Sequence, residues 1–135
     1  YYTSQNGYDT HDNQKTIHHN KLKELDEAVY AFYTEIKRAG LLQQVTLVVF
    51  SEFGRRVRDN GNGTDHGTAA PVFVIGGNTT GRIVGTNPNL DDLDQGDLKF
   101  ETDFRSVYAT LLQQKLQHPP TSIGITQAPL SGIFR

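Results

Sequence analysis

The chain of 135 residues contains no cysteine, no methionine and no tryptophan. The absence of cysteine excludes disulfide bonds, thiolate zinc sites and a cysteine nucleophile. No apolar run is long enough to cross a bilayer, so we expect no transmembrane segment. The formal net charge is only -2, and without a basic surplus we expect no nucleic-acid partner. The remaining classes are proteins that act on small molecules or bind other macromolecules through local sites.

The missing methionine also bears on how the chain begins. It opens on Tyr1-Tyr2, without an initiator methionine or a leader sequence. We therefore interpret residues 1–135 as a single fragment or processed piece of a longer domain, and the alternative is a removed N-terminal tag. Its length is enough for one modest domain.

Hydrophobic periodicity predicts two amphipathic helices. The first covers residues 16–39, where apolar residues recur at three- and four-residue steps and Gly40 is a suitable C-terminal cap. The second covers residues 103–117, with Thr102 as the N-cap and Pro119-Pro120 as the terminator. The stripe of the first helix consists of Leu22, Leu25, Val29, Phe32 and Ile36.

Short apolar runs at residues 45–50 and 72–75 predict two strands. Nearly continuous β-branched and apolar runs are typical of strands buried on both faces, as in a parallel sheet. We expect residues 54–67 to form a long loop, residues 82–86 a short edge strand, residues 87–97 an acidic loop, and the last fifteen residues a packed tail. Alternating strands and helices indicate an α/β architecture, although two such apolar strands are too few for a complete sheet.

Carboxylates and histidines flank the first of these strands on both sides in sequence. Asp9 and His11 stand two apart in a turn-rich segment, where both side chains can reach one ion; the alternative is an ordinary cap and a surface histidine. Glu52 follows a predicted buried strand, at the edge where α/β proteins bind ligands, or it is a turn cap. Asp65 and His66 lie between two glycines, in a metal site or an ordinary polar turn.

Basic residues cluster beside these candidates at Arg55, Arg56 and Arg58. A guanidinium presents a planar donor fork to phosphate, sulfate or carboxylate, so we single out Arg55 as a substrate anchor; the alternative is a solvated basic loop. His18 and His19 start the first helix and are interpreted as solvated residues rather than ligands.

At these positions the sequence resembles a known family of uncharacterised bacterial proteins, the domain of unknown function fifteen-oh-one. Residues 7–14, 45–55 and 60–66 carry the resemblance, above all through the Ser-Glu-Phe-Gly-Arg and Gly-Thr-Asp-His segments in this order and spacing. The family is related to sulfatases and belongs to the alkaline phosphatase-like superfamily. The resemblance extends from Gly7 to about Leu116.

The resemblance implies a fold and a chemistry. The chain would be the C-terminal portion of an alkaline phosphatase-like three-layer α/β/α sandwich with a mostly parallel sheet, whose N-terminal half is absent. Relatives hold divalent metals at strand ends and transfer phosphoryl or sulfuryl groups through a nucleophile in that N-terminal half. Members often carry a twin-arginine signal, which implies an exported or periplasmic parent protein.

The same resemblance assigns residues to metal sites. Asp9 and His11 resemble the aspartate and histidine of one site, and His66 resembles its late histidine. Glu52 takes the place of an Asp-His pair of a second site, but Phe53 follows it where a histidine is expected. An alternative alignment uses Asp65 with His66 as that pair. None of the serines, Ser4, Ser51 or Ser106, has the context of a nucleophile.

Three functions are consistent with these patterns. The first is the metal-binding half of a hydrolase of phosphate or sulfate esters, with zinc, manganese, calcium or magnesium as cofactor, a small anionic ester as substrate, and no activity in this piece alone. The second is a non-catalytic member that binds a polysaccharide, an envelope component or a protein. The third is a structural fragment that forms homo-oligomers through exposed sheet edges.

Overall fold

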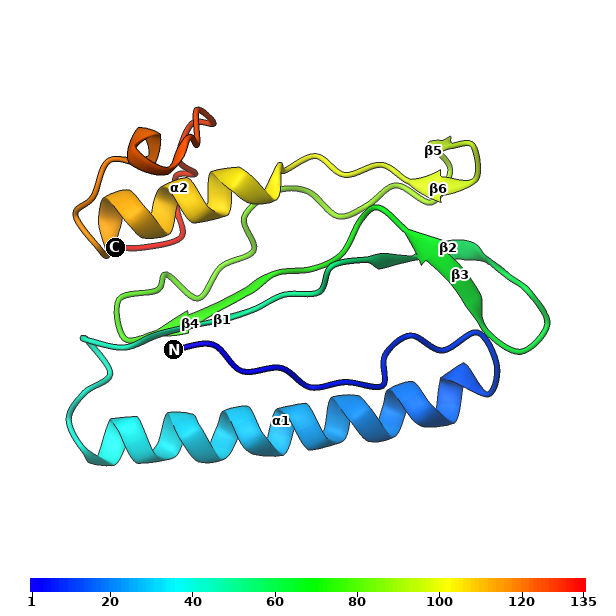
Figure 1. Ribbon diagram of the computed structural model, residues 1–135, viewed down its shortest axis with the longest axis horizontal. Helices are drawn as coiled ribbons and strands as arrows, with labels where there is room; N and C mark the ends of the chain where they lie inside the picture. Colours follow the sequence, from blue (N-terminus) through cyan, green and yellow to red (C-terminus); the bar gives the residue numbers. More distant parts are fainter.

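The computed structural model describes residues 1–135 as two helices on opposite sides of a narrow β layer (Figure 1). The longer helix lies along the bottom of the view and the shorter one along the top. The elements are α1 (Gln14–Arg38), β1 (Thr46–Val49), β2 (Gly54–Asp59), β3 (Thr64–Gly67), β4 (Phe73–Gly76), β5 (Leu93–Asp94), β6 (Asp97–Leu98), α2 (Phe104–Gln114) and the 3-10 helix η1 (Pro120–Ile123).

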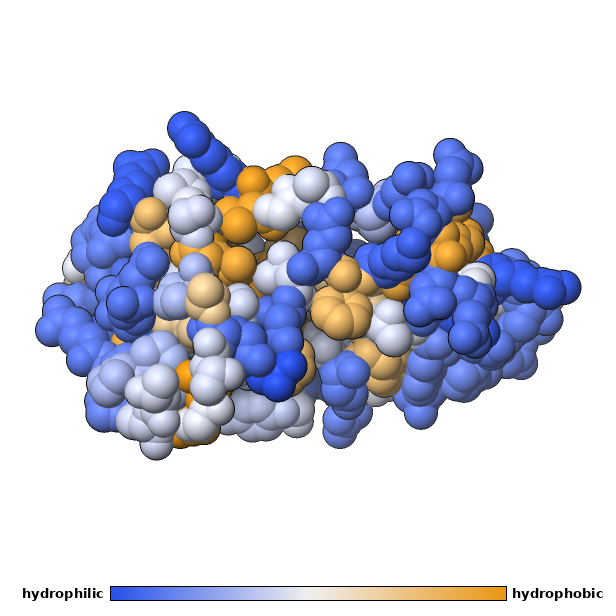
Figure 2. Space-filling model, turned by 90° about the horizontal axis from the view of Figure 1, so that it is seen from above, coloured by the Kyte–Doolittle hydropathy of each residue, from blue (hydrophilic) through white to orange (hydrophobic).

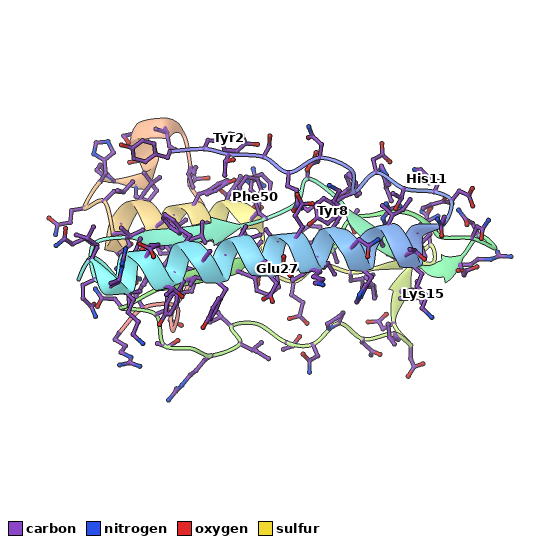
Figure 3. The ribbon with its side chains drawn as sticks, turned by 90° about the horizontal axis from the view of Figure 1, so that it is seen from below. Tyr2, Tyr8, His11, Lys15, Glu27 and Phe50 are labelled. Atoms are coloured by element: carbon purple, nitrogen blue, oxygen red, sulfur yellow. The ribbon has the colours of Figure 1, made fainter.

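The first predicted helix is confirmed as α1. Gly40 follows its C-terminus with φ +72°, a conformation that costs glycine nothing, and the Leu41 N–H donates back to the Ile36 carbonyl at 2.8 Å. Only part of the predicted apolar stripe is covered, because Ile36 is buried while Leu22 and Phe32 stay largely exposed. The extended N-terminal segment runs alongside α1 and brings His11 to the end of the helix that carries Lys15 (Figure 3).

The predicted parallel-sheet sandwich is wrong. The structure has three separate two-stranded sheets, all antiparallel, and β1 pairs only with β4, with Thr46 opposite Gly76 and Val49 opposite Phe73. The reason lies in the connection between these strands. A parallel pair needs a crossover, which is usually a helix, whereas residues 50–72 have no helical period and bring the chain back antiparallel. The molecule is a small mixed α/β domain.

The predicted loop over residues 54–67 is also wrong, because most of it forms the hairpin β2–β3. Its tip, Asn60-Gly61-Asn62-Gly63, is a strong turn signal, but the flanking strands are too polar to be recognised from an apolar pattern. The edge strand expected at residues 82–86 is absent, and the expected loop at residues 87–97 includes β5 and the first residue of β6.

The second predicted helix is confirmed as α2, although its N-cap is Asp103 rather than Thr102. The Asp103 carboxylate accepts a hydrogen bond from the Arg105 N–H at 2.9 Å. The tail packs against this helix as expected. Thr110 is fully buried; its hydroxyl donates to the Ser106 carbonyl at 2.7 Å and accepts from the Leu130 N–H at 2.8 Å.

The buried core is small and lies mainly between α2 and the tail. Only 8 of the 135 residues are buried, among them Val107, Ala109 and Ile125. Apolar side chains therefore reach the surface, and Figure 2 shows them in patches between polar groups on the face seen from above. No helix combines the length and the apolar character needed to cross a membrane.

Candidate metal centre

The hairpin β2–β3 sets the position of His66. Gly54 lies opposite Gly67 and Arg55 opposite His66, with a register shift between Arg55 and Asp59. A Cβ atom on Gly54 would meet the Ala69 carbonyl oxygen at 1.8 Å, so only glycine permits this close approach. Such irregularities re-aim side chains, and here the successive residues Asp65 and His66 both contact the same neighbouring segment.

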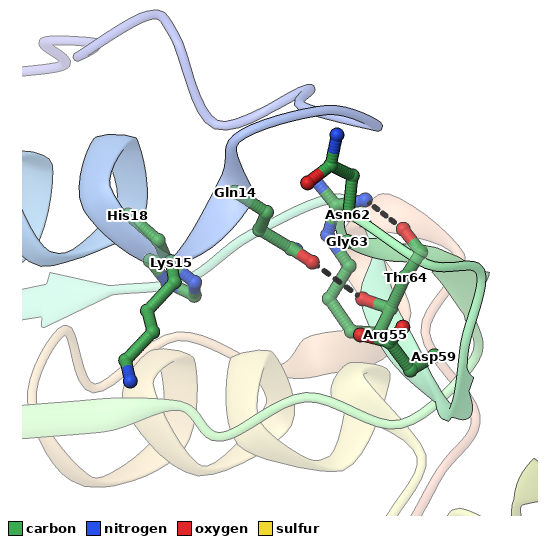
Figure 4. A pocket seen from close by; sticks show the side chains of 8 residues that line it. All are labelled: Gln14, Lys15, His18, Arg55, Asp59, Asn62, Gly63 and Thr64. Carbon is green, nitrogen blue, oxygen red and sulfur yellow. Dashed lines mark hydrogen bonds between the residues drawn. The ribbon is translucent and has the colours of Figure 1, made fainter.

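That neighbouring segment, residues 8–14, is attached to the hairpin by polar contacts. The Arg55 guanidinium donates to the carbonyls of Tyr8 at 2.5 Å and Thr64 at 2.6 Å. The Gln14 side-chain oxygen accepts from the Thr64 hydroxyl at 2.9 Å, and Figure 4 shows both bonds to Thr64 in a polar pocket that Lys15 also lines. These bonds hold two segments together that lie about fifty residues apart in sequence.

Asp9, His11 and His66 converge where the two segments meet. Nε2 of His66 lies 2.8 Å from Oδ1 of Asp9, and Nε2 of His11 lies 3.2 Å from the same oxygen. One ligand atom from each of the three residues lies within 4.8 Å of the other two. All three side chains are open to solvent, with exposed fractions of 68%, 51% and 40% respectively.

The two imidazoles act on the carboxylate electrostatically. The hydrogen bond between His66 and Asp9 is the largest cause that lowers the pKa of the Asp9 carboxyl below its ordinary value. Partial desolvation opposes this shift, and the charges of His66 and His11 reinforce it. Asp9 is therefore held in its ionised form, which is the form that ligates a metal.

Asp65 lies behind His11 rather than in the converging set. Its Oδ1 lies 3.4 Å from Nδ1 of His11, the ring nitrogen that faces away from Asp9. The Asn60 side-chain amide donates to the same Asp65 oxygen at 3.4 Å. A carboxylate on the far nitrogen of a ligating histidine fixes the tautomer and makes the near nitrogen a better donor.

The donor set fits a divalent transition metal. Bonds of about 2.0–2.2 Å to one ion place neighbouring ligand atoms roughly 3.0–3.5 Å apart in tetrahedral or octahedral geometry. The distances from Asp9 to His66 and to His11 are close to this range. Two imidazole nitrogens and one carboxylate oxygen suit zinc, manganese or iron, whereas calcium and magnesium favour all-oxygen sites.

The other predicted site residues lie outside this set. Glu52 is exposed in the turn before β2 and is not among the converging ligands. Arg55 is close to the centre, but at least two of its donors are used on backbone carbonyls, so it fastens the two segments; its role as a substrate anchor stays a prediction. His18 packs edge-on against Tyr8, and His19 is exposed on α1.

The sequence interpretation missed two residues at this centre. Asn60 falls within the long loop predicted for residues 54–67, and Phe53 stands where the resemblance leads one to expect a histidine. The Phe53 ring instead stacks on His66 with a centroid distance of 3.8 Å and an interplanar angle of 8°. The Asn60-Gly61 pair is a hairpin turn signal, and it is the one sequence pattern from which the position of both residues at the site could have been predicted.

Comparison with known proteins identifies the family to which these motifs belong. Neither the curated proteins nor the solved structures include a match to the chain. The profile of one family, described as protein of unknown function (DUF1501), matches residues 2–120. That range contains both segments of the candidate centre, and the chain belongs to this family.

Proposed function

We propose that Asp9, His11 and His66 bind one divalent metal and that this centre is the metal-holding part of a hydrolase of phosphate or sulfate esters. The observation that carries the proposal is the convergence of the three ligand atoms, with His11 supported from behind by Asp65. The relation of the family to sulfatases and to the alkaline phosphatase-like superfamily is part of this proposal and rests on the motifs alone. Export of the parent protein is likewise part of the proposal and rests on the same resemblance.

Exposure of the donors favours a catalytic centre over a structural one. Structural zinc sites are closed by four protein ligands, whereas catalytic sites keep a position open for water or substrate. Here three protein ligands face solvent. A bound divalent metal lowers the pKa of a coordinated water or alcohol and neutralises charge on ester oxygens.

The residues of this chain then have separate tasks. Asp9 supplies the anionic ligand, and its lowered pKa favours the ionised form. His11 and His66 supply nitrogen ligands, and the Asp65 carboxylate, 3.4 Å from Nδ1 of His11, is placed to orient that ring. Arg55 joins the two segments, so that ligands distant in sequence keep their spacing. Zinc is the preferred ion because two of the three ligands are imidazoles.

Zinc titration by calorimetry tests the metal proposal. We expect one zinc ion per chain, and His66→Ala and His11→Ala should weaken binding by more than the roughly 10- to 100-fold that loss of an outer partner costs. His118→Ala removes an exposed histidine outside the centre and is the matched control. Absence of saturable zinc binding, or equal loss in His118→Ala, would contradict the proposal.

Hydrolysis of p-nitrophenyl phosphate and p-nitrophenyl sulfate tests the catalytic part. We expect no turnover by this chain alone, because no serine in it has the context of a nucleophile. We expect turnover by the parent protein, whose N-terminal half would supply that nucleophile. His66→Ala should abolish that turnover. A longer form that binds zinc but hydrolyses neither ester would favour the second candidate, a non-catalytic protein that binds polysaccharide or an envelope component. The position of Glu52 outside the cluster favours that alternative, since it leaves a single metal site.

A further inference from the structure

Phe53 lies against the imidazole of a proposed metal ligand, in the position where a second-site histidine was expected. The two rings are almost parallel, with centroids 3.8 Å apart and planes inclined by 8°. His66 also stacks on the other histidine of the centre, His11, at 4.9 Å and 28°. The ligand imidazole therefore contacts two aromatic rings in addition to the Asp9 carboxylate.

The strand pairing explains why Phe53 meets His66. Phe53 immediately precedes β2, two residues before Arg55, and the Arg55 guanidinium carbon lies over its ring, so the two side chains lie on the same side of the chain. Arg55 is paired directly with His66 across the hairpin, and directly opposed residues also share a face. Phe53 is thus a diagonal neighbour of His66 on this face of the hairpin.

The Phe53 ring is itself held in place. The Arg55 guanidinium carbon lies 5.3 Å from its centroid, within the range of a cation–π contact. Arg55 is fixed in turn by the carbonyls of Tyr8 and Thr64. A half-buried ring with these neighbours on both strands has few alternative rotamers, so it is a firm surface for the imidazole.

From this arrangement we propose that Phe53 is a positioning residue, which holds the His66 imidazole so that Nε2 faces Asp9. The proposal deepens the proposed function and rests on it for its consequence in metal binding. A flat ring against one face of the imidazole restricts its rotation about the Cβ–Cγ bond. It also favours the electron-poor imidazole that metal ligation produces, because the face of a phenyl ring is negative.

The test compares Phe53→Leu, which removes the ring and keeps an apolar side chain, with Phe53→Tyr, which keeps the ring. Phe32→Leu, an exposed phenylalanine of α1, is the matched control. Co²⁺ is the probe, because its visible absorption reports both affinity and ligand geometry. We expect Phe53→Leu to weaken Co²⁺ binding about 10- to 100-fold and to change the absorption bands, as for other partners that orient a ligand. Phe53→Tyr and Phe32→Leu should match the wild type.

A second measurement keeps the two proposals distinguishable. In the metal-free protein, the Phe53 ring current should shift the NMR signals of the His66 ring protons upfield. Phe53→Leu should remove that shift while the protein stays folded, as its melting temperature would show. If the wild type binds no Co²⁺, the proposed function fails while the ring-current result still decides the positioning role. If the wild type binds Co²⁺ and Phe53→Leu binds it equally well, or the ring-current shift is absent, the positioning role is overturned.

Discussion

Asp65 shows at the scale of single residues how the centre depends on a group outside the donor set. It contacts the nitrogen of His11 that faces away from Asp9 and is itself oriented by Asn60. We predict that Asp65→Asn weakens zinc binding about 10- to 100-fold while the fold stays intact, because the negative charge beside Nδ1 of His11 is lost. Zinc calorimetry and circular dichroism measure the two effects. Asp26→Asn, an exposed change on α1, is the control; equal affinity in both variants would exclude an orienting role.

The lowered pKa of Asp9 gives a pH prediction. A carboxyl whose pKa is lower in the folded protein contributes stability above its unfolded pKa, and that contribution is lost as the pH falls through the folded value. The hydrogen bond with His66 is the largest cause of the lowering. His66→Ala should therefore raise the pKa of Asp9 in a ¹³C NMR titration of the carboxyl groups. Glu24, whose pKa is lowered by Lys21, should titrate unchanged in that variant. An unmoved Asp9 titration would show that His66 is not its partner.

At the scale of elements, the hairpin β2–β3 carries the centre, and Gly54 controls the hairpin. We predict that Gly54→Ala destabilises the protein by about 1–3 kcal/mol or more, because the added Cβ overlaps the Ala69 carbonyl. Zinc affinity should fall with stability, although Gly54 is no ligand. Chemical denaturation and zinc calorimetry measure both effects. Val57→Ala on the exposed part of the same strand should change stability by less than about 1 kcal/mol. A fully stable Gly54→Ala protein would contradict the described close approach.

The element α2 is joined to the tail by the hydroxyl of Thr110. This fully buried group accepts the Leu130 N–H, and Thr110→Val keeps the side-chain shape but leaves that donor without a partner. We predict a loss of about 1–3 kcal/mol in the free energy of unfolding, measured by urea denaturation. Thr110→Ser keeps the hydroxyl and removes one methyl group, so its loss should stay near 0.8 kcal/mol. Equal losses in the two variants would assign the effect to packing rather than to the hydrogen bond.

At the scale of the whole molecule, the accessible surface is large. It measures 9991 Å² for a chain of 15.1 kDa, whereas a folded monomer of that mass exposes about 7,100 Å². The two-stranded sheet β1–β4 has both edges free, and apolar residues such as Phe73 and Phe104 are more than half exposed. Free edges and exposed apolar groups favour association between chains.

We therefore predict that the isolated chain self-associates at micromolar concentrations. A standard interface buries about 800 Å² on each partner, well below the excess of about 2,900 Å² over the expected surface. Sedimentation velocity over a hundredfold dilution should show an increasing sedimentation coefficient with concentration. Val48→Lys in β1 should reduce the association, because a charge in an edge strand discourages edge-to-edge pairing. A compact monomer at every concentration would contradict this prediction.

Local features of this fold could be predicted from the sequence, but the pairing of strands could not. α1, α2, β1 and β4 have clear periodicities or apolar runs, so their existence was recognised. The predicted parallel direction was wrong because apolar runs indicate burial, not orientation. The absence of a helix between β1 and β4 is the feature that excludes a parallel pairing. The polar strands β2 and β3 have no apolar pattern at all, so only their turn residues marked them.

The site was more predictable than the sheet, because donor chemistry is visible in residue types. Asp9, His11 and His66 were proposed as one set and the structure places them together. Glu52, predicted from its place after a strand, lies outside this set, and its role as a ligand stays a prediction. Asn60 and Phe53 were missed because their roles depend on the register of the hairpin, and an amide or a phenyl ring suggests no metal chemistry by itself.

Anomalous diffraction at the zinc absorption edge tests the central claim most directly, on crystals of the chain grown with zinc. We predict one strong peak per chain, at about 2.0–2.2 Å from Oδ1 of Asp9 and from Nε2 of His11 and His66. Asp65 should remain on Nδ1 of His11 in that structure. A map without a peak at this position, or with its strongest peak at an unrelated residue such as His118, would contradict the assignment of a metal centre.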